Sequence, residues 1–285
     1  MRTAFVVLTY NRSDALLAVL RGLAPQCTAQ DLVVVADDGS RPEHVEALKQ
    51  GLPQFACPVR HVWHPDTGFT AARARNLGAL QAHADYLVFM DGDCVPNPQF
   101  VQQHRLLAQA GMFVNGSRVL LSEALSARAA GGAVDLQALQ AADWLRLRLS
   151  GDVNKLTHLV HWAGAPFRVE PRFRWKGIRS CNFGVWASDF ESVNGFDESF
   201  SGWGHEDADL VLRLHNQGCS RKNGFLGTEV FHLWHRENSR SGEAANRARV
   251  LERQDTGITR AATGLEQAAQ SPGAIAIELN RSRRD

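Results

Sequence analysis

The first hundred residues alternate between short strand-like and helix-like segments, and this alternation restricts the possible folds more than any other feature of the chain. Runs of β-branched and aromatic residues are separated by amphipathic or Ala- and Leu-rich stretches. The expected strands are Ala4–Thr9, Asp31–Ala36, Val59–Trp63 and Tyr86–Met90, and the expected helices are a segment that ends at Leu23, Pro42–Gln50 and Thr70–Ala84. Such βαβ units predict an α/β fold with a mostly parallel central sheet flanked by helices.

The pattern changes after residue 110. We expect helices over Phe100–Ala110 and from about Glu206 to Gln217, and a strand over Met112–Asn115. Leu136–Leu149 is expected to be helical, although its last six residues also alternate like a strand. Residues 165–179 hold five basic residues and several aromatics, which fits either a mobile loop near a site or a solvated connection. The tail from Arg236 is predicted to be helical in part, and residues 270–285 are predicted to be frayed.

Polar residues follow three of the predicted strands at the point where each strand ends. Asn11 comes after the first strand, Asp38 after the second and Asp91 after the fourth. Ligands of parallel α/β sheets bind beyond the carboxyl ends of the strands. The sequence therefore predicts a functional site at this edge of the sheet.

Composition excludes several classes of protein. The 285 residues include 31 Lys and Arg against 30 Asp and Glu, which gives a formal net charge of +1, and 44% of them are hydrophobic. Such a chain resembles neither a basic nucleic-acid binder nor a disordered segment. The apolar runs are too short to span a bilayer, and no secretory signal is expected at the N-terminus. The five cysteines are widely spaced, which predicts reduced thiols in a cytoplasmic protein.

Asp91-Gly-Asp93 places two carboxylates around a glycine directly after a buried strand. If the chain turns at Gly92, both side chains can face one small space. Hard oxygen ligands of this kind suit Mg²⁺ or Mn²⁺, especially beside a diphosphate. A surface turn explains the same three residues equally well.

A second acidic segment, Phe200–Leu210, places Gly202, Trp203 and Gly204 before three carboxylates at the start of a predicted helix. Acidic residues in a first helical turn are expected because they complement the helix dipole. The Gly-Trp-Gly loop is harder to explain by capping, since glycine permits unusual backbone conformations. A carboxylate on such a loop is well placed to act as a general base toward a hydroxyl.

Histidines recur at a spacing of three residues in the pairs His61/His64, His158/His161 and His232/His235. No pair has the cysteines or the glutamate of a common zinc motif. On a strand this spacing places the two side chains on opposite faces, so we expect at most one of each pair to serve a given site.

Four motifs in order make the chain similar to nucleotide-sugar glycosyltransferases of the GT-A fold, family 2. The second half resembles the galactosyltransferase C-terminal region of β-1,4-galactosyltransferases and bacterial chondroitin polymerases. The motifs, which together span roughly residues 3–240, are Leu8–Arg12, Ala36–Ser40, Asp91–Asp93, and Gly202–Asp207 with His235 downstream.

The resemblance implies a nucleotide site built from the first loops. Thr9, Tyr10, Asn11 and Asp38 would contact the nucleotide, together with Asp91. Asn11 fits a helix cap equally well, whereas a simple turn explains Asp37-Asp38 less well. Residues 68–76 resemble the segment that closes over the diphosphate, which Arg73 or Arg75 would neutralise unless they are solvated helix charges.

The resemblance also implies a metal and a catalytic base. Asp93, with Asp91 nearby and His235 as a later ligand, would hold Mn²⁺ or Mg²⁺, and imidazole favours Mn²⁺. Asp207 corresponds to the catalytic base and Glu206 to its acidic neighbour, while Trp203 and Gly204 would line the acceptor or donor sugar. His205 and Ala208 depart from the galactosyltransferase pattern, which leaves the identity of both sugars open.

The expected activity is a metal-dependent inverting transfer of a sugar from a nucleotide donor, with UDP favoured by the resemblance. The acceptor would be a hydroxyl of a saccharide or a glycolipid, with no nucleic-acid partner and no membrane span, and peripheral membrane association is compatible with the sequence. Residues 1–110 would form the nucleotide-sugar half, residues 111–240 the acceptor and catalytic half, and residues 241–285 a tail. Two alternatives stay open: a sugar-phosphate nucleotidyltransferase, and an inactive nucleotide- or carbohydrate-binding module.

Overall fold

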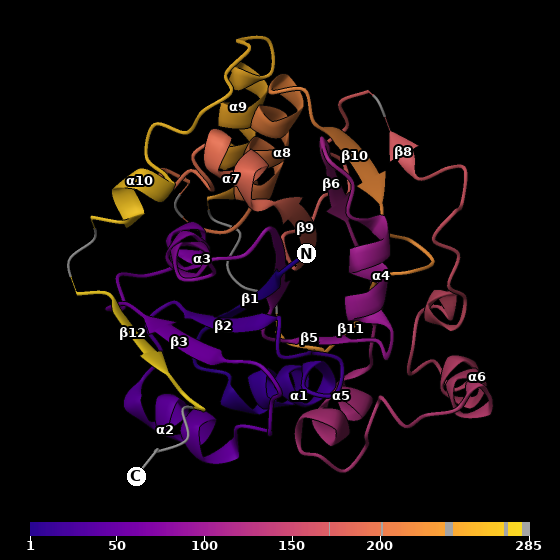
Figure 1. The fold of residues 1–285 in the computed structure, drawn as a ribbon. Coiled ribbons are helices and arrows are strands. Elements are labelled where there is room, and N and C mark those ends of the chain that lie inside the picture. Colours follow the sequence, from indigo (N-terminus) through magenta and orange to yellow (C-terminus); the bar gives the residue numbers. More distant parts are fainter. Residues whose placement is uncertain (171, 201, 237–241, 271–272, 281–285) are drawn as a thin grey trace.

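A nine-stranded sheet in the order β12-β3-β2-β1-β4-β9-β6-β10-β8 forms the centre of the protein, and a smaller sheet, β5-β11-β7, lies beside it (Figure 1). The structure is a computed structural model, and it describes residues 1–170, 172–200, 202–236, 242–270 and 273–280. The strands are β1 (Thr3–Thr9), β2 (Leu32–Asp37), β3 (Val59–Trp63), β4 (Tyr86–Asp91), β5 (Cys94–Pro96), β6 (Met112–Asn115), β7 (Ser117–Leu120), β8 (Val169–Glu170), β9 (Asn182–Trp186), β10 (Ser220–Asn223), β11 (Glu229–His232) and β12 (Ile275–Glu278).

Helices cover both faces of the large sheet, with α1 and α2 on one side and α3, α7 and α8 on the other (Figure 1). The helices are α1 (Ser13–Leu23), α2 (Pro42–Gly51), α3 (Ala71–Leu80), α4 (Phe100–Leu107), α5 (Glu123–Ala130), α6 (Ala141–Leu149), α7 (Ala187–Ser192), α8 (Glu206–Asn216), α9 (Glu243–Arg253) and α10 (Leu265–Ala268), with a 3₁₀ turn, η1, at Thr157–Leu159. The predicted α/β fold is therefore confirmed.

Two apolar cores on opposite faces explain why the central strands are continuous hydrophobic runs. Along β1, Phe5 and Val7 pack against α1, whereas Ala4 and Val6 belong to the core under α3 and α7. A parallel strand covered on both faces has no side that tolerates polar residues. Parallel pairing holds for β3-β2-β1-β4 and for β6-β10, while β9, β8 and β12 pair antiparallel with their neighbours.

The strand register brings the polar strand ends together. Thr9 lies opposite Asp37, and Leu8 lies opposite Asp91. In the sheet order β3-β2-β1-β4, the chain adds β2 and β3 on one side of β1 and then β4 on its other side. Open α/β sheets bind ligands at such a reversal of strand order. The predicted convergence at the carboxyl edge is confirmed.

Several segments differ from the sequence-based predictions. β12 lies within the segment predicted to be frayed and pairs antiparallel with β3, although residues 271–272 and 281–285 lie outside the described part. The segment 165–179 is neither a free loop nor a purely solvated connection. It contains β8, and the buried Arg168 donates hydrogen bonds to five backbone carbonyls. Trp144–Leu149, which also alternates like a strand, lies in helix α6.

Within the described residues, none of the helices has the length and apolar character needed to cross a membrane. All five cysteines are buried free thiols, as the spacing predicts.

Candidate active site

Loops after three parallel strands form one connected corner of the site. Asp38, after β2, accepts hydrogen bonds from the backbone N–H and the hydroxyl of Thr70 and lies 3.1 Å from His64 Nε2. Its own backbone N–H donates to the carbonyl of Thr9 (3.0 Å). Gly39 has φ of +94°, and a Cβ there would come within 2.6 Å of the Asp66 backbone. The three loops are therefore packed too closely for any residue except glycine at position 39.

Asn11 links two of these loops and does not cap a helix. Its side-chain oxygen accepts from the Arg41 backbone N–H (2.9 Å), and its own N–H donates to Ser40 Oγ (2.9 Å). The N-cap of α1 is Arg12, without a side-chain capping bond, so the cap interpretation of Asn11 is wrong. Its left-handed backbone, φ 49°, turns the amide away from the helix and toward the second loop.

Tyr10 stands at the exposed mouth of this corner. Its hydroxyl donates to Asp66 Oδ2 (2.9 Å), and this hydrogen bond raises the pKa of Tyr10 and contributes to the lowered pKa of Asp66. The ring is about half exposed and lies beside the strand ends, where a planar ligand can reach it.

Arg75 ties the fourth strand end to the acidic segment 130 residues further on. The buried guanidinium contacts Asp91 Oδ1 (2.8 Å) and Glu206 Oε1 (3.1 Å) and lies 5.4 Å from the centre of the Phe196 ring. Burial opposes the charge of Arg75, but the two carboxylates outweigh it and raise the pKa of the guanidinium. Arg75 is thus held between two carboxylates. Neither sequence-based interpretation of Arg75, as a diphosphate contact or as a solvated helix charge, included these two ion pairs.

Arg73, two residues earlier on α3, is half-buried and has a different environment. Its Nε atom is buried and lacks a hydrogen-bond partner within the described residues. Burial raises the pKa of the nearby Glu198, and the hydrogen bond from Asn76 and the charge of Arg73 offset part of this increase. Of the two arginines predicted to face a diphosphate, Arg73 has more of its donor capacity left.

Asp93 lies next to two imidazoles. His235 Nε2 is 3.3 Å from Asp93 Oδ2, His232 Nε2 is 3.8 Å from Oδ1, and the two ring centres are 5.2 Å apart. Gly92 allows the chain to turn here, because its N–H bonds to the Leu8 carbonyl and a Cβ would lie 2.7 Å from that oxygen. The predicted turn at Gly92 is confirmed.

The expectation that only one histidine of this pair reaches the site is wrong. β11 ends at His232, so the alternation of a strand stops there. The next two residues are fixed by hydrogen bonds, from Leu233 N–H to the Asp93 carbonyl and from Trp234 N–H to Ser126 Oγ, which bring His235 back to the same side. His61 and His64 behave alike: β3 ends at Trp63, and the two rings contact Asp37 and Asp38.

A divalent cation fits this donor set. Carboxylate oxygen and imidazole nitrogen together suit Mn²⁺. Burial lowers the pKa of His232, with Asp93 opposing, which keeps the ring neutral and its lone pair free to bind. The neighbouring thiol of Cys94 belongs to the same group, because ligand atoms of Asp93, Cys94 and His232 all lie within 4.8 Å of one another. Burial and contact with Cys181 raise the pKa of Cys94 well above the ordinary value. His232 was not among the predicted ligands, and the HxxH spacing was the only signal for it.

Asp207 has an environment unlike that of its acidic neighbours. Within the described residues its oxygens accept hydrogen bonds from two backbone N–H groups, those of Ser180 (3.3 Å) and Ala208 (2.7 Å). Burial, and after it the charge of Glu206, raises the pKa of Asp207 to about 7, against the opposing effects of Arg75 and the two N–H groups. A carboxyl group with such a pKa is suited to accept and release a proton near neutral pH.

The loop before α8 has the unusual backbone that its glycines predict. Gly202, Gly204 and His205 all have positive φ, of 75°, 97° and 72°. The Gly204 carbonyl accepts from the Asn246 side chain of α9 (3.0 Å), so the segment after residue 240 helps to hold this loop. Trp203 lies within the loop and is partly buried. Trp175 packs against His205 with ring centres 5.5 Å apart, which brings the basic segment to the edge of the site.

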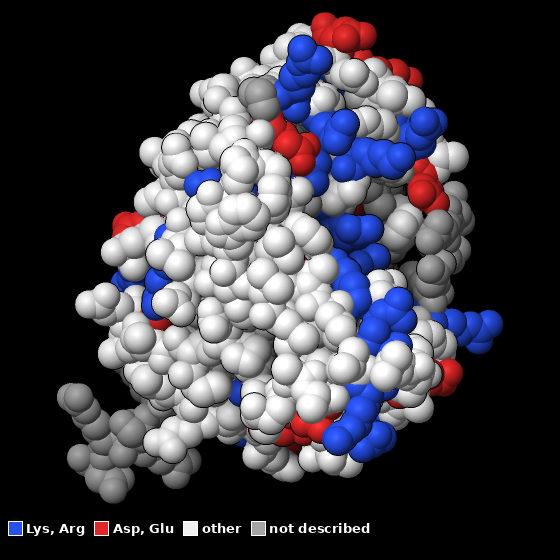
Figure 2. All heavy atoms as spheres, turned by 90° about the vertical axis from the view of Figure 1, so that its right-hand side faces the viewer, with Lys and Arg blue, Asp and Glu red and all other residues white. Residues whose placement is uncertain are grey.

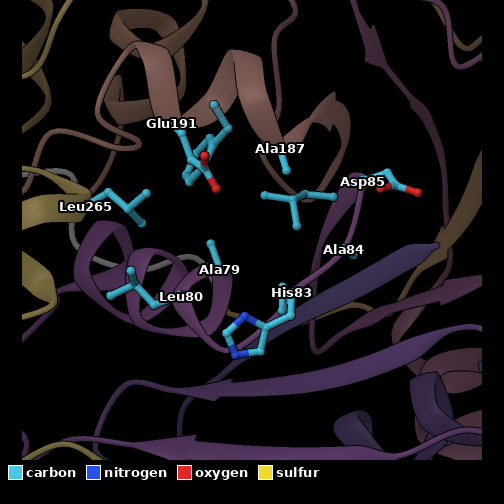
Figure 3. Close-up of a pocket in the computed structure, with 11 residues that line it drawn as sticks. Ala79, Leu80, His83, Ala84, Asp85, Ala187, Glu191 and Leu265 are labelled. Atoms are coloured by element: carbon cyan, nitrogen blue, oxygen red, sulfur yellow. The ribbon is translucent and has the colours of Figure 1, made fainter. Parts of the chain in front are cut away.

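A cavity of about 260 Å³ lies elsewhere, between α3, α7 and α10 (Figure 3). Asp85 and His83 lie at the start of β4, so the cavity opens at the amino edge of the sheet. Its lining holds Ala and Leu side chains with Glu191, and it includes no Lys or Arg. It therefore lacks the cations that a nucleotide diphosphate needs.

Comparisons with known proteins agree with this geometry. Residues 4–124 match the model of glycosyl transferase family 2, and residues 165–236 match the one described as the N-terminal domain of galactosyltransferase. In these two segments the chain is similar to family 2 glycosyltransferases and to galactosyltransferases. The predicted resemblance in both halves of the chain is confirmed.

Relatives and a solved structure extend the likeness. Validoxylamine A glucosyltransferase of Streptomyces hygroscopicus subsp. jinggangensis is 33% identical over 220 residues, 75% of this chain and 51% of that protein. Chondroitin synthase of Escherichia coli is 27% identical over 240 residues, 76% of this chain and 32% of the relative. The crystal structure of GalNAc-T7 with UDP, GalNAc and Mn²⁺ aligns with a TM-score of 0.55 at 17% identity, over 88% of this chain and 48% of that one. The chain thus spans about half the length of the first relative, and its fold is that of the GT-A transferases.

Proposed function

We propose that this chain is a metal-dependent, inverting glycosyltransferase that moves a sugar from a nucleotide donor, UDP-sugar in the first instance, to a hydroxyl of a saccharide or glycolipid. The observation that carries the proposal is the state of Asp207. It is the carboxylate of the acidic segment whose described contacts are backbone N–H groups, and its pKa lies near 7. UDP and Mn²⁺ are named in the structure of GalNAc-T7, which shares the fold.

The nucleotide would lie over the strand-end corner. Tyr10 offers a half-exposed ring there, and Asp38 and Asn11 are fixed by bonds from neighbouring loops, which orients their remaining acceptor capacity. Arg73, which is half-buried on α3, would bind the diphosphate through its guanidinium. Preorganised groups of this kind bind a donor without spending free energy on ordering the loops.

Mn²⁺ or Mg²⁺ would be held by Asp93, His232 and His235. Asp91 directly precedes Gly92 on the same turn. Such a cation, when bound, stabilises the charge of a leaving diphosphate without a proton transfer. Among the described contacts of Asp93, none is with a Lys or Arg side chain.

Asp207 would accept the proton of the acceptor hydroxyl as its oxygen attacks the anomeric carbon. The bond between that carbon and the diphosphate breaks in the same displacement, so one base and one step invert the anomeric centre. Glu206 keeps Arg75 in place and raises the proton affinity of Asp207, while Trp203 and Gly204 would line the sugar. The five reduced thiols are compatible with a cytoplasmic site of action.

A panel of UDP- and GDP-sugars tests the proposal. With Mn²⁺ present, at least one donor should release free nucleotide, and a chelator or the change Asp93→Ala should abolish the release. Donor binding by calorimetry without release for any donor would favour an inactive binding module. Release of pyrophosphate from a nucleoside triphosphate and a sugar phosphate would favour a nucleotidyltransferase instead.

A further inference from the structure

We propose that the described residues between 145 and 179 form a docking surface for an anionic lipid membrane. This surface, which we name the α6–β8 face, combines exposed apolar side chains with an excess of positive charge. It lies on the side of the molecule that carries α6 and β8, and it reaches the edge of the active site at Trp175, which packs against His205 (Figure 1).

Exposed apolar side chains are concentrated on this face. Sixteen large hydrophobic side chains are exposed among the described residues, and seven of them lie in the 25 residues from 145 to 169. They are Leu145, Leu149, Leu159, Val160, Trp162, Phe167 and Val169. Leu149 is 80% exposed and Trp162 51%. Such clustering exceeds the scattered single apolar residues of an ordinary surface, and it indicates contact with a partner or a membrane.

The apolar side chains are held in place and do not sit on a loose loop. Arg168 is 2% exposed and donates to the carbonyls of Trp162, Ala163, Asn223, Phe225 and Leu226. Trp162 also donates its backbone N–H to the Leu226 carbonyl (3.0 Å), and its ring meets that of Phe167 at 6.0 Å. On the other side, Trp144 of α6 packs on His158 and Phe231, which fixes the helix that carries Leu145 and Leu149.

Positive charge surrounds these side chains. Residues 145–179 contain eight Lys or Arg and two Asp or Glu, an excess of six charges in a chain whose formal net charge is +1. Seen from this side, the Lys and Arg side chains form a band that runs beside a broad area without charged residues (Figure 2). The exposed members are Arg146, Arg148, Arg172, Arg174, Lys176 and Arg179.

This combination favours a lipid surface over a soluble polyanion. An anionic polysaccharide would use the arginines and could stack on the Trp162–Phe167 pair, but it gives the aliphatic Leu145, Leu149 and Val160 nothing to bury against. At a bilayer, aliphatic and aromatic side chains enter the boundary between headgroups and acyl chains, and each nearby Lys or Arg adds attraction to anionic lipid. The proposal does not depend on the proposed function, because vesicle binding is measured without sugar transfer.

Vesicle binding by the purified chain tests the proposal. Sedimentation with phosphatidylcholine vesicles containing one third phosphatidylglycerol should capture the protein at low salt, with clearly less capture by pure phosphatidylcholine. Arg148→Glu with Lys176→Glu should weaken the binding at least about tenfold, since each cation near an anionic surface contributes on this scale. Leu149→Ser with Val160→Ser leaves the charges unchanged, and this double variant should also weaken vesicle binding.

Matched controls lie on other faces of the molecule. Arg2→Glu with Lys49→Glu changes the net charge by the same amount, and Leu251→Ser removes an exposed leucine from another helix, α9. Both variants should bind vesicles like the wild type. Circular dichroism and melting curves confirm that each variant is folded. Three results would each overturn the proposal. The Arg148 variant and the control variants bind vesicles equally, the protein binds soluble heparin tightly but not vesicles, or the protein forms a dimer that the Leu149 variant dissociates.

Discussion

At the scale of single residues, three carboxylates in one turn of α8 have three different environments. Glu206 is buried against Arg75, and Asp209 is fully buried between Arg213 and Arg253. Asp207 accepts from backbone N–H groups and has a pKa of about 7. A charge at Asp207 is therefore costly for the fold at neutral pH, as expected of a residue kept for chemistry.

Asp207→Asn should stabilise the protein increasingly as pH rises. The pKa of Asp207 in the folded state lies above its unfolded value, so its contribution to stability is fully present below about pH 4 and is lost as pH rises through about 7. Asn cannot ionise, and it keeps an acceptor oxygen for one of the two N–H groups. We expect the stability gain to be about 2–3 kcal/mol larger at pH 8 than at pH 5, at about 1.4 kcal/mol per pKa unit. Melting curves of both proteins across this range check it, and a constant difference would contradict the assignment.

Arg75→Met should destabilise the protein strongly, because it leaves Glu206 buried without its cation and Asp91 beside it. Breaking a buried ion pair from one side costs roughly 3–5 kcal/mol. Denaturant unfolding at neutral pH measures the loss. The control is Arg73→Met two residues earlier, which should change stability by less than about 1 kcal/mol while raising the KM for the donor. Equal losses for both variants would remove the special role of Arg75.

At the scale of secondary-structure elements, α9 in the C-terminal segment packs against α8 and the loop that precedes it. Arg253 on α9 contacts Asp197 Oδ2 (2.8 Å) and Asp209 Oδ1 (2.6 Å), both fully buried. Asn246, on the same helix, holds the Gly204 carbonyl of the loop before Asp207. α9 thus braces α8 and the glycine loop from outside the matched galactosyltransferase segment, which ends at residue 236.

Arg253→Ala should detach this brace. We expect a loss of roughly 2–3 kcal/mol in unfolding free energy, because two buried carboxylates lose a charged partner while Arg213 still holds one of them. Arg247→Ala, an exposed position on the same helix, is the control and should have almost no effect. The loss is read from chemical denaturation, and matching results for the two variants would show that α9 is not braced through Arg253.

The elements show what local pattern can and cannot predict. Periodicity located the first four strands to within one residue or two, because strands buried on both faces are continuous apolar runs. It failed at residues 275–278, whose strand forms by pairing with β3, more than 200 residues earlier. It also failed for the histidine pairs, because the strand ends before the second histidine and the faces no longer alternate.

At the scale of the whole molecule, the near-neutral net charge hides two regions of opposite character, which meet where Trp175 packs against His205. Carboxylates gather at the carboxyl edge of the sheet, around Asp91, Asp93, Glu206 and Asp207, whereas positive charge gathers on the α6–β8 face. The strand-end rule predicted the first region from sequence, because parallel strands bring their ends to one edge. It did not predict which cation each acid contacts, since Arg75 reaches Asp91 and Glu206 only through the tertiary fold.

The turnover of Asp207→Asn, measured together with donor affinity, tests the central claim most directly. Asn has nearly the same volume and keeps an acceptor oxygen for one of the two N–H groups, those of Ser180 and Ala208, but it cannot take a proton from a hydroxyl. The account predicts donor binding close to wild type and a turnover lower by at least about two orders of magnitude, within the range that a general base contributes. A variant that transfers sugar at nearly the wild-type rate would show that Asp207 is not the base.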